Sequence, residues 1–201
     1  MIRTPTNAPV DLQAIVLANS VNHWNYFSFL FMMPTYFAKV WSLNIRASAL
    51  YSLLPWLAMG TMSYVAGAIA DALLPRLGTA NVRKAVQTLA FLGPATLLAV
   101  LLRCDSPDAA LACLTAALGL ASFGQAGFVS NIQDVGGRAA GRLFGIANTA
   151  GCLAGIAGTT AAGVILQTPG AGWAALFQLQ IVLYVFGAAF YVANAKAEAE
   201  F

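Results

Sequence analysis

The chain has 201 residues, of which 60% are hydrophobic and only 8% are charged, and its mean hydropathy is +0.75. Soluble domains carry about 25% charged residues, so this composition excludes an ordinary soluble domain and indicates an integral membrane protein. The formal net charge of +3 is spread among connecting segments rather than gathered in a basic stripe, which gives no support to nucleic-acid binding.

The cysteines indicate no metal or redox chemistry. Cys104, Cys113 and Cys152 are odd in number and lack the spacing of zinc ligands or of a disulfide framework. We interpret them as small apolar packing residues and expect neither a metal site nor a cofactor.

Six apolar runs are long enough to cross the hydrocarbon core as helices, which takes about 17–25 residues. The sequence therefore predicts an all-α membrane protein with a six-helix bundle over residues 12–195, between a short N-terminal segment, 1–11, and a polar C-terminal tail, 196–201. The expected spans are 12–37, 47–70, 85–102, 109–130, 143–166 and 173–193. Helices are expected because only a helix or a closed barrel satisfies its backbone in lipid.

The basic residues predict the orientation of the bundle. With six spans both termini lie on one side, and the Lys and Arg residues divide seven against three between the two sides. The richer side holds Arg3, Arg76, Arg83, Lys84, Arg138, Arg142 and Lys196, and the poorer side holds Lys39, Arg46 and Arg103. By the positive-inside rule, both termini are expected to face the cytoplasm, or the stroma in a plastid membrane.

Polar side chains gather in the first expected span. His23 is the only histidine of the chain, and an ionisable group at membrane depth costs a few kcal/mol unless it faces a bundle interior or a wet cavity. Asn19, His23 and Tyr26 share a helix face that Asn22 and Trp24 flank. This face is suited to holding an oxyanion or relaying a proton. The alternative is a buried histidine that is satisfied by one backbone carbonyl.

A second polar cluster lies at the end of the fourth expected span. Its members are Gln125, Ser130, Asn131, Gln133 and Asp134. Arg138 and Arg142 follow Asp134 at i+4 and i+8, so an ion pair that latches this face is one interpretation. A solvated loop network is the other.

A third arrangement joins the second and third expected spans. Asp71 ends one helix, and Arg76, Arg83 and Lys84 follow in the connector predicted at 71–84. An aspartate here can meet the positive end of another helix and pair with nearby arginines. Such a contact can hold one conformation closed.

Several segments carry a resemblance to a known family. Residues 67–71 (GAIAD), followed by Arg83 and Lys84, resemble the loop signature of major facilitator transporters, although Pro75 and Arg76 disturb its spacing. The chain also resembles the anion:cation symporter family, which includes vesicular glutamate transporters, sialin and plant plastid phosphate and ascorbate transporters. The segments that carry this likeness are 21–27 (VNHWNYF), 33–37 (MPTYF), 53–56 (LLPW), 82–84 (VRK), 125–128 (QAGF) and 145–151 (GIANTAG).

The resemblance implies the C-terminal six-helix half of such a transporter, so we expect a partial chain whose substrate site is completed by an N-terminal half. In the glutamate-carrying branch an arginine stands two residues before the tryptophan, where this chain has Asn22, and this departure favours the plastid branch. The family's Asn and Asp near the end of the tenth helix match Asn131 and Asp134.

The resulting hypothesis is a secondary active transporter for inorganic phosphate or small organic anions, in a plastid or other membrane, coupled to sodium or protons by alternating access. Its substrate path would include Asn22, His23, Trp24, Tyr26, Gln125, Asn131 and Asn148. Its gate would include Asp71, Arg83, Lys84, Asp134 and Arg138.

Two other functional classes are alternatives to a transporter. A six-span half-transporter or membrane interaction protein without its own transport activity is the first alternative, and self-association is the property that would distinguish it. An intramembrane serine protease is the second, but there is no G-x-S-x-G motif and no serine motif follows the only histidine, so we expect that the protein is not an enzyme.

Overall fold

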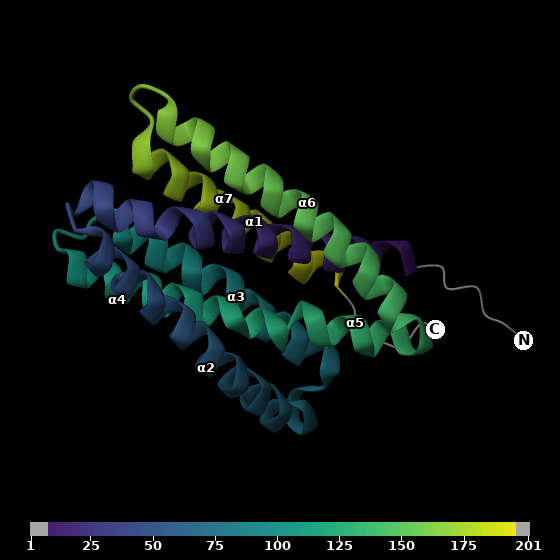
Figure 1. The fold of residues 1–201 in the computed structure, drawn as a ribbon. Helices are drawn as coiled ribbons and strands as arrows, with labels where there is room; N and C mark the ends of the chain where they lie inside the picture. Colours follow the sequence, from purple (N-terminus) through teal and green to yellow (C-terminus); the bar gives the residue numbers. More distant parts are fainter. Residues whose placement is uncertain (1–7, 196–201) are drawn as a thin grey trace, which may run out of the picture.

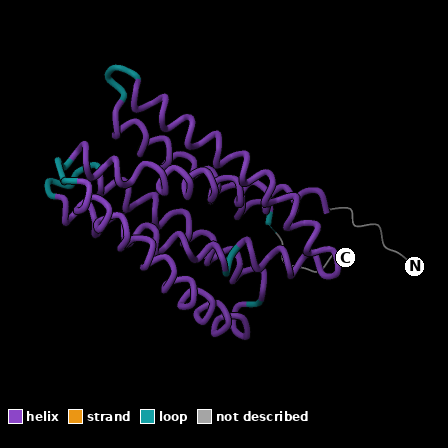
Figure 2. The backbone as a smooth tube through the Cα atoms, viewed as in Figure 1, coloured by secondary structure: helices purple, strands orange, loops and turns teal. Residues whose placement is uncertain are grey.

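The computed structural model describes residues 8–195, and this part of the chain is an all-α bundle without strands, as the sequence predicts (Figure 2). Its α-helices are α1 (Ala8–Val40), α2 (Ile45–Leu77), α3 (Thr79–Leu101), α4 (Pro107–Ala121), α5 (Phe128–Gly136), α6 (Ala140–Gln167) and α7 (Gly172–Asn194). Two 3-10 turns, η1 (Ser122–Gln125) and η2 (Gly137–Ala139), lie on either side of α5. The tail expected at 196–201, most of the segment expected at 1–11, and with them Arg3 and Lys196, lie outside the described residues.

The first three helices are longer than expected. The helix α1 begins at Ala8 rather than at residue 12, and the connector expected at 71–84 is reduced to Gly78. Alanine and leucine favour helix on both sides of Asp71, so this aspartate does not end α2. Gly78 makes the sharp turn at φ 75°, which glycine adopts without steric cost, and its N–H donates to the Leu74 carbonyl over 3.0 Å.

The fourth expected span is a broken helix rather than a continuous one. It ends as α4 at Ala121, passes through η1, and resumes as α5 at Phe128. Gly124 and Gly127 lie in the break, where their weak helix propensity leaves the path of the backbone to its neighbours. The sequence also predicts a connector at 132–142, between the fourth and fifth expected spans. This prediction is wrong, because α5, η2 and the start of α6 occupy these residues.

The main helix contacts join the first three helices to the later ones. The helix α1 packs on α6 and on α7, and α4 packs on α2 and on α3 (Figure 1). The described ends of α1 and α7 lie at one end of the bundle, together with the α2–α3 turn and the start of α6.

The outside of the bundle is apolar. Leu153, Ile156 and Val182 expose 64%, 65% and 62% of their area, as suits a surface in contact with lipid. Within the described residues, four helical stretches are long and apolar enough to cross a membrane: Ile45–Leu77, Thr79–Leu101, Pro107–Gln167 and Gly172–Asn194. The helix α1 falls short because its polar cluster lowers its hydropathy, so six membrane crossings stay a prediction.

Candidate functional site

His23 lies in the contact between α1 and α6. Its Nδ1 is 3.0 Å from the Asn19 carbonyl, one turn earlier on α1, and its ring also interacts with the side chain of Asn148 on α6. The Asn19 amide donates to the Ala147 carbonyl over 2.6 Å, which ties the same two helices together. The structure therefore brings His23 and Asn148, both predicted path residues, to one place on opposite helices.

Glycines on α6 allow this close contact. A Cβ at Gly151 would lie 2.7 Å from Asn19 Nδ2 and 2.9 Å from His23 Nδ1. Gly155 lies against the Phe27 ring and Gly158 against the Trp24 ring in the same way. Trp24 thus packs in the contact between α1 and α6, which we call the glycine seam (Gly151, Gly155 and Gly158 with the α1 side chains they touch).

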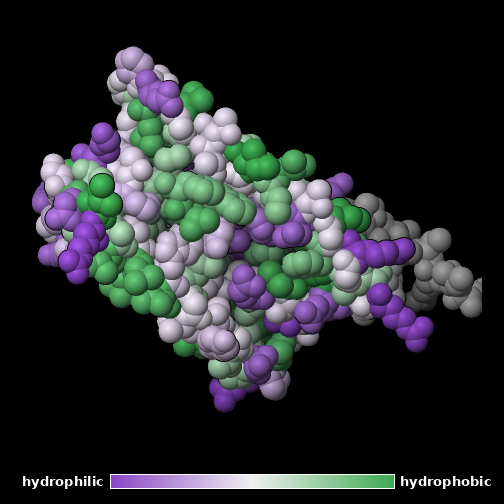
Figure 3. All heavy atoms as spheres, in the orientation of Figure 1, coloured by the Kyte–Doolittle hydropathy of each residue, from purple (hydrophilic) through white to green (hydrophobic). Residues whose placement is uncertain are grey.

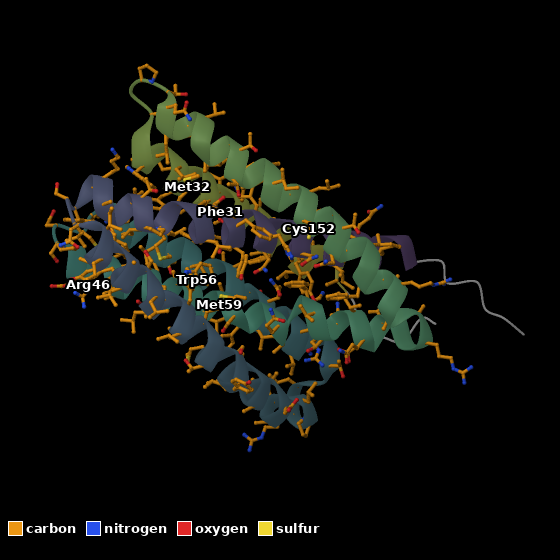
Figure 4. The ribbon with its side chains drawn as sticks, in the orientation of Figure 1. Phe31, Met32, Arg46, Trp56, Met59 and Cys152 are labelled. Carbon is orange, nitrogen blue, oxygen red and sulfur yellow. The ribbon has the colours of Figure 1, made fainter. Side chains whose placement is uncertain are left out.

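A second group of predicted residues faces the other way from α1. Asn22 and Tyr26 line a small cavity with Trp56 and Met59 of α2 and Ser122 and Gln125 of η1. Tyr26 packs edge-on against the Trp56 ring at 5.1 Å. Figure 4 shows Trp56 and Met59 on the side of α2 that faces α1, and Arg46 at the far end of the bundle. The broken helix is what places Gln125 opposite Asn22 and Tyr26.

The cavity is polar but carries no charge. Its lining combines amide, hydroxyl and aromatic groups, and none of its residues is Asp, Glu, Lys or Arg. Its volume of about 20 Å³ has room for roughly one water molecule and is too small for phosphate or ascorbate in this conformation. Figure 3 shows polar side chains in the middle of this face of the bundle, with apolar patches over α6 and α2.

The gate residues Arg83 and Asp134 form an ion pair. Arg83 Nε lies 2.6 Å from the Asp134 carboxylate, and this is the only ion pair among the side chains that the structure describes, those of residues 12–195. The Arg83 side chain is 10% exposed and that of Asp134 is 24% exposed. Arg83 Nη1 also donates to the Ala126 carbonyl over 2.9 Å. The sequence left open an ion pair of Asp134 with Arg138 or Arg142 and a solvated loop network, and α3 supplies the partner instead.

The break between η1 and α5 is stabilised from α3. A break leaves backbone groups without helical partners. Arg83 Nη1 donates to the Ala126 carbonyl, and Gln87 Oε1, one turn further along α3, accepts a hydrogen bond of 3.0 Å from the Phe128 N–H. Gly127 lies directly against the Gln87 side chain, so α3 and the break approach closely. Sequence reasoning missed Gln87, because a lone glutamine in an apolar run has no periodic signal.

Replacing Gln87 with leucine is expected to destabilise the bundle by about 1–3 kcal/mol, because the buried Phe128 N–H loses its acceptor. The measurement is thermal unfolding of the purified protein in detergent. Thr96→Ala is the matched control, since the Thr96 hydroxyl is exposed on the same helix and bonds only to Gly93 of its own helix. Equal unfolding temperatures for the two variants would contradict this role of Gln87.

Asn131 is the most deeply buried of the predicted path residues. It lies on α5 with no exposed area, and neither its Oδ1 nor its Nδ2 has a hydrogen-bond partner. A buried amide in this state is usually satisfied by a water or a ligand. Asn131 does not line the cavity of Asn22, Tyr26 and Gln125, so its place in the path stays a prediction.

The remaining gate residues are not brought together. Asp71 and Arg138 are exposed, Lys84 is half-buried, and none of the three takes part in an ion pair within the described region. The basic residues of the described region still divide by end. The end with the start of α1 and the end of α7 holds Arg76, Arg83, Lys84, Arg138 and Arg142, and the other end holds Lys39, Arg46 and Arg103. Which end faces which compartment stays a prediction.

The chain's relatives are transporters of plant chloroplasts. No protein-family model matches the chain. Over 87% of its length it is 42% identical to a probable anion transporter 4 of Oryza sativa, and 41% identical both to an ascorbate transporter and to a sodium-dependent phosphate transport protein 1 of Arabidopsis thaliana. All three are described as chloroplastic, and these relatives are named as transporters rather than enzymes.

The alignments cover less of the relatives than of this chain. The chain spans 29%, 32% and 34% of the lengths of these three proteins, about a third in each case. The relatives are therefore anion transporters that are about three times as long as this chain. The structure itself shows an all-α membrane bundle.

Proposed function

We propose that this bundle is one half of a secondary active transporter that moves inorganic phosphate or a small organic anion across a plastid membrane by alternating access. The observation that carries the proposal is the similarity over 87% of the chain to chloroplast transporters, one named for ascorbate and one for phosphate. Six membrane crossings and coupling to a sodium or proton gradient belong to the same proposal. The sodium-dependent relative supports the choice of sodium.

The uncharged cavity supports a half-site. Asn22, Tyr26 and Gln125 offer N–H and O–H donors that can hold anion oxygens, but no lining side chain of this cavity balances a negative charge. Burying an unpaired anion is costly, so a second charged surface has to face the cavity. In the proposed transporter a further six-helix unit supplies it, since sites of this kind lie between two halves near the midplane.

The ion pair supports a gate at one end of the path. Arg83 joins α3 to α5 through Asp134 and joins α3 to the break through Ala126. Movement of α5 relative to α4 would change the position of Gln125 in the cavity, because the break lies between them. The gate in this proposal is therefore Arg83 with Asp134, and Asp71, Lys84 and Arg138 contribute surface charge.

Replacing His23 or Gln125 with alanine is expected to lower transport by about tenfold or more, which corresponds to the loss of roughly 1.4 kcal/mol of interaction in the rate-limiting state. The measurement is uptake of radiolabelled phosphate and ascorbate by vesicles that contain the full-length protein. Arg46→Gln is the control, since Arg46 is exposed at the far end of α2. Normal uptake of both anions by both variants would contradict the assigned path.

A distinct result is expected for the non-transporting alternative. If the bundle acts only by association, vesicles with the unaltered full-length protein take up neither anion, whereas crosslinking detects a stable partner. Open glycines on the outside, Gly60 and Gly67 of α2 and Gly141 and Gly145 of α6, leave room for another helix in either case. Uptake is therefore the measurement that separates the two functions.

A further inference from the structure

Two cysteines that are separate in the sequence meet at the turn between α3 and α4. Cys104 lies in this turn, Cys113 lies in the second turn of α4, and their Sγ atoms are 3.7 Å apart. Both are free thiols and both are half-buried. A disulfide requires the sulfur atoms to approach to about 2.05 Å, and Cys104 belongs to a turn rather than a helix, so a side-chain rotation with a small shift of the turn suffices.

The packing around the pair holds the thiols together. Both cysteines contact the same hydrophobic cluster, which includes Tyr36, Leu101 and Leu114. Cys104 Sγ also lies 3.6 Å from the Val100 carbonyl at the end of α3. The two side chains thus share one position between the end of α3 and the start of α4, whereas Cys152 is exposed elsewhere on α6.

The segment between the two cysteines carries a polar contact to α2. Asp108, in the first turn of α4, accepts a hydrogen bond of 2.6 Å from the Tyr51 hydroxyl on α2. A bond between Cys104 and Cys113 would close a loop around Asp108. It would restrict the movement of this turn relative to α3 and so favour the arrangement in which Tyr51 and Asp108 meet.

We propose that Cys104 and Cys113 form a reversible redox pair whose oxidation fixes the first turns of α4 to the end of α3. Each thiol loses a proton, one Sγ–Sγ bond forms, and the two electrons pass to a small disulfide such as oxidised glutathione, which takes up the protons and leaves as two thiols. Lys39, Arg46 and Arg103 lie at the same end, which the charge distribution predicts to face away from the cytoplasm or stroma. Disulfides persist where the compartment is oxidising.

The test uses the purified chain in detergent, incubated with oxidised glutathione, alkylated, digested and examined by mass spectrometry. The expected product is a peptide pair joined through Cys104 and Cys113, lighter by two hydrogen atoms and separated again by dithiothreitol. Cys152 provides the internal negative control, because it lies beside Leu153 and Ile156 on the lipid-facing surface of α6 and is expected to stay a free thiol. Cys104→Ser and Cys113→Ser are each expected to abolish the joined pair, and Cys152→Ala is expected to keep it.

Two outcomes would overturn the proposal. One is free or singly glutathionylated Cys104 and Cys113 after incubation with an excess of oxidised glutathione. The other concerns the mechanical consequence: amide hydrogen exchange at residues 104–109 is expected to slow by about tenfold on oxidation of the Cys152→Ala variant, and not in Cys113→Ser. If the Cys104–Cys113 disulfide forms but amide hydrogen exchange at residues 104–109 is unchanged, the proposal that oxidation fixes α4 to the end of α3 is refuted.

Discussion

Replacing Arg83 with methionine is expected to lower the stability of the bundle by about 1.5–3 kcal/mol, the range for hydrogen bonds to a charged group, because the ion pair is only partly buried. Two groups lose their partner at once, because the guanidinium binds both the Asp134 carboxylate and the Ala126 carbonyl. Methionine keeps most of the side-chain volume, so the loss reports the polar contacts rather than a cavity. The measurement is thermal unfolding of the purified protein in detergent.

The controls for Arg83 come from the other predicted gate residues. Asp71→Asn and Arg138→Gln are expected to change stability by less than about 0.5 kcal/mol, because both side chains are exposed. The double variant Arg83→Met with Asp134→Leu is expected to be more stable than the two single losses predict, since no charge is then left unpaired. Additive losses would show that Arg83 and Asp134 act separately and would contradict the ion pair as the latch.

Replacing Gly155 with valine is expected to destabilise the glycine seam by about 3 kcal/mol, at the upper end of the range for overpacking. The new side chain would enter the space of the Phe27 ring, which contacts Gly155 directly. Because α1 and α6 form the most extensive helix pair of the bundle, they would have to separate along the seam. Thermal unfolding in detergent measures the loss.

Gly163→Val is the matched control for this second prediction. It carries the same β-branched residue on the same helix, but no atom lies within 4 Å of a Cβ at Gly163. The compensating change Phe27→Ala is expected to recover part of the stability of Gly155→Val, since it vacates the space that valine takes. Equal unfolding temperatures for Gly155→Val and Gly163→Val would show that the seam does not depend on close approach.

The candidate site was predictable in its residue types and less so in its grouping. A lone histidine and several amides in an apolar run are costly in lipid, so His23, Asn22 and Asn131 stand out from the sequence alone. Their division into two groups, His23 with Asn148 on one side of α1 and Asn22 with Gln125 on the other, depends on which helix packs on which face. Helical periodicity predicts one face for Asn19, His23 and Tyr26. In the structure Asn19 and His23 contact α6, whereas Tyr26 packs on Trp56 of α2.

The proximity of the two cysteines shows the same limit. Cys104 and Cys113 are nine positions apart and match no ligand or disulfide pattern, so the sequence predicts only packing. The turn between α3 and α4 reverses the chain and brings the thiols to 3.7 Å. Sequence spacing alone does not record such a reversal.

Hydrophobic composition and run length are enough to predict the class of the protein, an all-α membrane bundle, because backbone groups in lipid are satisfied within helices. The partner of each polar group, by contrast, depends on how the helices pack. Asp134 pairs with Arg83 of α3 rather than with nearby Arg138, and the fourth span breaks where Arg83 and Gln87 can bind its free backbone groups. The reason is that hydropathy is a local sum along the chain, whereas an ion pair or a helix break is stabilised by whichever groups the packing of distant helices brings within hydrogen-bond reach.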